Sequence, residues 1–136
     1  MTSTRRFADP VAKVVLALDA LAFGAFGALY LVRPEAMADS VGISLRDAGA
    51  IIDIQGMYGG LELGAAAFLV YCLLGADRRK TGVLAGTCFL GWIALARYLA
   101  VARFGSPGPA VTQLLAIDSL GAILNLVAYA LYARRA

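Results

Sequence analysis

The chain has 136 residues, of which 61% are hydrophobic and only 15% are charged, and its mean hydropathy is +0.78. Soluble domains carry charge on about a quarter of their residues, so this composition excludes an ordinary soluble protein and predicts an integral membrane protein. The net charge of +3 does not indicate nucleic-acid binding, because the cations lie beside apolar segments, where membrane topology explains them.

Four apolar segments predict four membrane-spanning helices. The first follows a tail that holds Arg5 and Arg6, and Pro10 is placed to open the helix. A cleaved signal peptide is the rival interpretation, but the apolar run is longer than the roughly 7 to 15 residues of a signal sequence and contains an aspartate. The sequence therefore predicts one all-α domain, 1–136, folded as an up-down bundle of four transmembrane helices over about 11–32, 49–75, 82–104 and 110–133.

Two loops separate these segments most clearly. The segment 33–49 is expected to be the longest loop, and the S-x-x-D spacing from Ser44 to Asp47 predicts a capping box that starts the second helix near Leu45. The Gly- and Pro-rich segment 105–109 separates the last two helices.

Lysine and arginine residues predict the orientation. One side of the membrane receives Arg33, Arg46 and Arg103, and the other receives most of the cations: Arg5, Arg6, Lys13, Arg78, Arg79, Lys80, Arg134 and Arg135. The positive-inside rule then places both termini and the 77–80 turn of this multi-pass protein in the cytoplasm.

The segment 53–64 combines acids and glycines inside an apolar helix. Gly56, Gly60 and Gly64 recur at every fourth position, a pattern that predicts a close contact with a neighbouring helix. Tyr58 and Glu62 fall on the adjoining face of the same helix. A glutamate in the middle of a membrane span is costly, and it indicates a partner or a function.

Three ionisable residues on different helices are expected at one depth. At about 1.5 Å per residue, Glu62 lies roughly 18 Å from the cytoplasmic end of its helix, Arg97 roughly 21 Å and Asp118 roughly 22 Å. A planar guanidinium group can bind two carboxylates, so the sequence predicts a Glu62–Arg97–Asp118 cluster with Tyr58 beside it.

A second polar layer is expected nearer the cytoplasm. Asp19 and Asn125 both lie roughly 10 to 12 Å from that face by the same rise. Each belongs to a stripe that should face the inside of the bundle, namely Asp19, Phe23, Phe26 and Tyr30 on the first helix and Asp118, Ala122, Asn125, Tyr129 and Tyr132 on the fourth.

The buried groups contain more acid than base. If all were ionised, Asp19, Glu62 and Asp118 would outnumber Arg97 by three to one. Because burial disfavours charge, we expect at least one carboxyl group to be protonated, or to be neutralised by a cation or a ligand. The simpler interpretation is that the polar cluster only fixes how the helices pack.

Cofactor chemistry is not expected. The chain has no histidine, the commonest metal ligand, so we predict no transition-metal site and no cofactor. Cys72 and Cys88 both lie in apolar segments and are expected to be packing residues rather than a disulfide.

The chain resembles a family of small bacterial membrane proteins, DUF4345, which looks related to the DoxX-like four-helix group. The resemblance rests on Tyr58-Gly59-Gly60-Leu61-Glu62-Leu63-Gly64, on Ala96-Arg97-Tyr98 and on Asp118. Family members usually have a basic residue shortly before the YGG segment and often a glutamate in the fourth span, where this chain has Gln55 and Asp118. The resemblance implies a four-helix bundle in the inner membrane, and the family name assigns no function.

Four functions fit these patterns. The first is binding of a lipid-like or quinone-like amphiphile by Tyr58, Glu62, Arg97 and Asp118. The second is a membrane enzyme, an isomerase or a quinone-linked activity, in which a protonated carboxyl group acts as acid or base. The third is proton-coupled or cation transport through Asp19 and Glu62. The fourth is a structural subunit, in a homo-oligomer or with another membrane protein, that docks through the glycine stripes 56/60/64 and 82/86.

Overall fold

The computed structural model describes residues 3–105 and 108–133. All regular structure in these residues is helical. The elements are α1 (Ser3–Val32), α2 (Pro34–Ser40), α3 (Ala48–Ile54), the π-helix η1 (Gln55–Gly60), α4 (Leu61–Leu74), α5 (Arg79–Phe104) and α6 (Pro109–Ala133).

Four helical segments are long and apolar enough to cross a membrane, namely Ala8–Val32, Ala48–Leu74, Arg79–Phe104 and Pro109–Tyr132. Their outward faces carry large apolar side chains: Leu21 is 70% exposed and Trp92 is 69% exposed. Lipid tails satisfy such faces, whereas water does not. The predicted all-helical fold with four apolar helices is confirmed, and it is consistent with a four-span membrane bundle.

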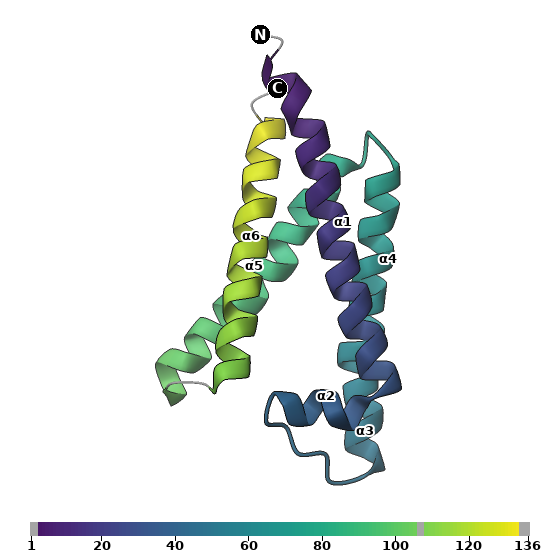
Figure 1. The fold of residues 1–136 in the computed structure, drawn as a ribbon, viewed down its shortest axis with the longest axis vertical. Helices are drawn as coiled ribbons and strands as arrows, with labels where there is room; N and C mark the ends of the chain where they lie inside the picture. The colour runs from purple at the N-terminus through teal and green to yellow at the C-terminus, as the bar shows by residue number, and fades with distance from the viewer. Residues whose placement is uncertain (1–2, 106–107, 134–136) are drawn as a thin grey trace.

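The long helices form two limbs. Helix α1 packs along α4, and α5 packs along α6, while α1 also contacts α5 and α6. The limbs meet where α1 begins and α6 ends, and they diverge toward the opposite end, where α2 lies across the foot of α1 (Figure 1). We call these the joined end and the open end.

The main hydrophobic core lies toward the joined end. Leu16, Leu69 and Val83 are completely buried there, one from each of α1, α4 and α5. Helix α5 approaches closely because it has glycines at the contact: a methyl group at Gly82 would lie 2.6 Å from Cys72 Cβ, and one at Gly86 would meet the side chain of Asn125. The 82/86 stripe is thus used inside the molecule, and its predicted role as a docking face is wrong.

Within the described chain, no neighbouring helix packs closely on Gly56, Gly60 and Gly64, so that predicted contact is wrong, while docking of another chain on this exposed stripe stays a prediction. All three are exposed, and a methyl group at Gly56 or Gly64 would meet nothing within 4 Å among the described residues outside its own helix. The close contact is made by Gly59 and by Gly27 of α1, where a methyl group would lie 2.9 Å from the Gly59 carbonyl oxygen. The π-helix widens this turn, so the four-residue spacing of an α-helix does not apply across it.

Three local predictions differ from the structure. The loop 33–49 contains α2, because Pro34 supplies the fixed φ angle that suits the first turn of a helix. Helix α3 is capped by Asp47, whose carboxylate accepts a hydrogen bond of 2.9 Å from the Ala50 N–H, and not by Ser44. Helix α1 starts at Ser3, so Pro10 lies within it, with only the first two turns before it.

Candidate functional site

A cavity of about 520 Å³ lies between the two limbs toward the open end. Its walls are mostly aromatic and aliphatic. They consist of Ala22, Phe23, Phe26, Tyr30, Met37, Ser40, Val41, Ile43, Tyr58, Glu62, Leu90, Ile93, Arg97, Ala110, Val111, Gln113, Leu114, Ile117 and Asp118. All four residues that the sequence predicts for ligand binding are among them. An apolar cavity of this size with a few polar groups is typical of small-molecule sites.

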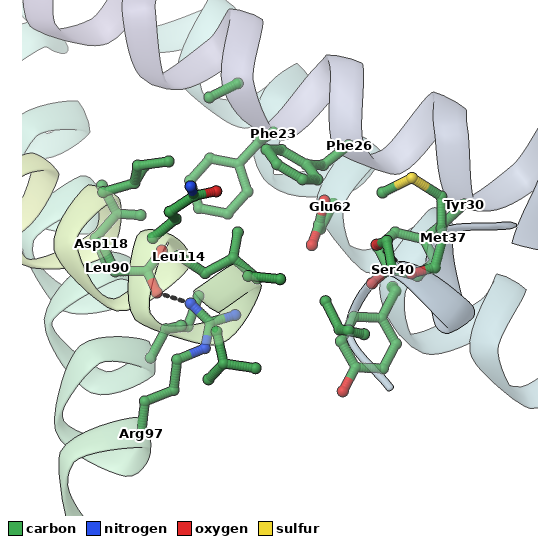
Figure 2. Close-up of a pocket in the computed structure, with 18 of the residues that line it drawn as sticks. Phe23, Phe26, Tyr30, Met37, Ser40, Glu62, Leu90, Arg97, Leu114 and Asp118 are labelled. Carbon is green, nitrogen blue, oxygen red and sulfur yellow. Dashed lines mark hydrogen bonds and ion pairs between the residues drawn. The ribbon is translucent and has the colours of Figure 1, made fainter. Parts of the chain in front are cut away.

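Arg97 and Asp118 form an ion pair on one wall of the cavity. The guanidinium Nη1 of Arg97, on α5, binds the carboxylate Oδ2 of Asp118, on α6 (Figure 2). Asp118 is 8% exposed, and the Arg97 side chain is 29% exposed because part of it borders the cavity. The two helices bring these groups together because they pack along one another, as the depth argument expects.

Glu62 enters the cavity from the other limb, on α4, and faces the ion pair across the open space (Figure 2). No ion pair joins Glu62 to Arg97 in the described residues, so the predicted three-residue cluster is only partly assembled. Oxygen Oε2 of Glu62 is buried, and no hydrogen-bond donor of the described chain reaches it. A buried polar atom without a partner costs about 1–3 kcal/mol, and more if it is charged.

The turn before Glu62 is the π-helix, which aims Tyr58 into the cavity. The ring of Tyr58 lies against the ring of Tyr30, with centroids 5.0 Å apart and an angle of 31° between the planes. The Gln55 side-chain amide donates a 2.8 Å hydrogen bond to the Leu31 carbonyl oxygen, which ties this turn to the end of α1. π-Helical turns are frequent at functional sites.

The second polar layer forms a direct contact. The Asn125 amide nitrogen donates a 2.7 Å hydrogen bond to Asp19 Oδ2, and both residues are buried. The amide nitrogen also donates a 2.9 Å hydrogen bond to the Gly121 carbonyl oxygen. The Asn125 side chain fits here because Gly86, which it approaches closely, has no side chain. Asp19 and Asn125 do not belong to the cavity lining, so the two polar layers have no common space.

A third polar group at the joined end escapes the sequence analysis. Asp9 Oδ1 accepts a 2.7 Å hydrogen bond from Arg79 and a 3.1 Å hydrogen bond from the Tyr132 hydroxyl, and Oδ2 lies 3.4 Å from the Lys13 ammonium group. This terminal clasp joins α1, α5 and α6. The signal was available, because Asp9 lies in the sequence next to Arg5, Arg6 and Lys13, in a part of the chain rich in cations.

The polar groups of the cavity differ in kind. The cavity offers a buried acceptor, a salt-bridged guanidinium group and aromatic walls. Among residues 3–105 and 108–133, no three side chains of the kinds that bind metals come together at one place. Both thiols, Cys72 and Cys88, are free.

Comparison with known protein families identifies the chain. Residues 11–129 match the domain of unknown function DUF4345, a stretch that includes the cavity and the Asp19–Asn125 contact. The chain belongs to the DUF4345 family. No curated protein and no solved structure matches it. Membership in the DUF4345 family does not indicate a ligand for the protein, and the relation of the family to the DoxX-like group stays a prediction.

Proposed function

We propose that this protein binds an amphiphile, lipid-like or quinone-like, with its polar head group in the cavity between the limbs. The observation that carries the proposal is Glu62, whose carboxyl oxygen is buried at the cavity without a donor from the described residues. Tyr58, Arg97 and Asp118 supply the other polar groups of the same cavity. A ligand that enters from the lipid between the limbs brings its apolar chain along Leu90, Ile93 and Leu114.

The size of the cavity supports the same conclusion. Small-molecule sites typically measure about 300–1,000 Å³, and a volume of about 520 Å³ falls within that range. An interior kept only for helix packing would instead be filled by side chains, because protein interiors are close-packed. The transport hypothesis gains no such support, since Asp19 lies outside the cavity.

The test is native mass spectrometry of the protein purified in mild detergent, with identification of co-purifying molecules. We expect a bound amphiphile in the wild type and weaker retention in Leu114→Trp, which places a larger side chain in the cavity. The matched control is Leu126→Trp on the same helix, where Leu126 is 55% exposed on the outer face. A wild type without any bound molecule, or equal retention by Leu114→Trp, overturns the proposal.

We also propose that the joined end faces the cytoplasm of a bacterial inner membrane. Lys13, Arg79 and Lys80 lie toward this end, while Arg33, Arg46 and Arg103 lie toward the open end (Figure 1). A fluorescent protein fused to the C-terminus should fluoresce, because it folds in the cytoplasm. An alkaline phosphatase fusion at the same position should be inactive, and an active one would reverse the orientation.

A further inference from the structure

The charges around the cavity leave one acid without a counter-charge. Asp118 is neutralised by Arg97, and no cation among the described residues is paired with Glu62. An ionised Glu62 therefore gives the cavity a net charge of −1. A buried carboxylate is stable only with a partner, so this charge calls for a cation or a strong hydrogen-bond donor.

The walls near Glu62 are rich in aromatic rings. Phe23, Phe26, Tyr30 and Tyr58 line the same cavity, and Figure 2 shows Phe23 and Phe26 on one side of the Glu62 carboxyl group and Tyr30 beyond it. The faces of aromatic rings carry negative potential and attract ammonium groups, and sites for such ligands combine several rings. A hydroxyl group would satisfy the carboxylate but would gain little from the rings.

We propose that the head group held in this cavity is an ammonium group, bound by the Glu62 carboxylate and the surrounding aromatic faces. This inference rests on the proposed function and specifies the chemistry of its ligand. An ammonium group makes the occupied cavity neutral. An anionic head group would instead face Glu62 and would find a guanidinium group already bound to Asp118.

The ammonium group has two possible sources, the head of a membrane lipid or a single-chain amine, and native mass spectrometry separates them. In one arm, the delipidated protein receives phosphatidylethanolamine and phosphatidylglycerol with identical acyl chains. In the other, it receives decylamine and decanol. Preference for the amine-bearing probe in either arm supports the proposal and identifies the source. The absence of a preference for the amine-bearing probe in both arms overturns it.

Variants then test the groups that recognise the ammonium. Glu62→Gln should reduce the preference for the amine by about tenfold or more, because a charge-assisted contact is lost. Asp53→Asn makes the same change at an exposed position and should leave the preference unaltered. Phe26→Leu should reduce it about three- to tenfold, whereas Trp92→Leu, on the outer face, should not. An unchanged preference in both Glu62→Gln and Phe26→Leu, each checked for folding, overturns the proposal.

The same experiment distinguishes this inference from the proposed function. If the wild type retains an amphiphile more fully than Leu114→Trp does, but the amine probes bind no better than their partners, amphiphile binding stands and the ammonium assignment fails. If no probe and no co-purifying molecule binds, both fail.

Discussion

The Arg97–Asp118 ion pair should respond unequally to the loss of each partner. Removing one member of a buried pair costs about 3–5 kcal/mol, because the other charge is left buried. The Asp118 side chain is 11% exposed and that of Arg97 is 29% exposed. Arg97→Met strands the more buried group, and we expect it to lower the free energy of unfolding by about 3 kcal/mol. Asp118→Asn lets the guanidinium group turn toward the cavity and should cost only about 1–2 kcal/mol.

A double-mutant cycle checks this reasoning. The double variant Arg97→Met/Asp118→Leu removes both charges. Its loss in free energy of unfolding should be smaller, by at least about 1.5 kcal/mol, than the sum of the losses in the two single variants. The free energy of unfolding is measured by circular dichroism in mixed micelles with increasing SDS, with Arg103→Met as the control at an exposed position of α5. Equal costs for Arg97→Met and Asp118→Asn, or a double variant that equals the sum, would refute the unequal burial and the coupling.

Three further changes test contacts elsewhere. Gly27→Ala should lower the free energy of unfolding by about 1–3 kcal/mol, because the new methyl group meets backbone atoms; Gly64→Ala, which meets nothing, should be neutral or stabilising by the same SDS titration. Asn125→Ala leaves Asp19 without its donor and should cost about 1–3 kcal/mol, and a cost below 0.5 kcal/mol contradicts the buried contact. Asp9→Ala breaks the terminal clasp and should speed proteolysis near the joined end without abolishing the proposed amphiphile binding, because the cavity lies toward the open end.

Helix depth predicted the polar contacts well wherever the two helices are packed against each other at the depth in question. Counting residues placed Asp19 level with Asn125 and Arg97 level with Asp118, and both pairs are in contact. The same counting placed Glu62 at the level of Arg97 but could not reveal that they stay apart. A short connection between α4 and α5 fixes their distance only at the joined end, and the limbs then diverge.

Two features lay beyond residue periodicity for different reasons. The π-helix arises from a shift in backbone hydrogen bonding at 55–60, which no side-chain pattern in the segment indicates. The predicted stripe of Gly56, Gly60 and Gly64 therefore misses Gly59, the glycine that packs against α1. Helix α2 did have a signal, because Pro34 and Glu35 suit the first turn of a helix. The loop predicted for 33–49 does not include this helix, since a proline that ends one helix can also start the next.

The shape of the molecule links its stability to the proposed ligand. The joined end is held by a packed core, the terminal clasp and the Asp19–Asn125 hydrogen bond, whereas the limbs at the open end enclose a cavity. An amphiphile that binds there supplies the contacts that the diverging helices lack. A ligand that binds only the folded protein stabilises it by about 2.7 kcal/mol when its free concentration is a hundred times Kd. In an SDS titration, the free energy of unfolding should rise by that amount when the ligand is bound. The same gain should be smaller in Leu114→Trp, because the larger side chain leaves less room in the cavity.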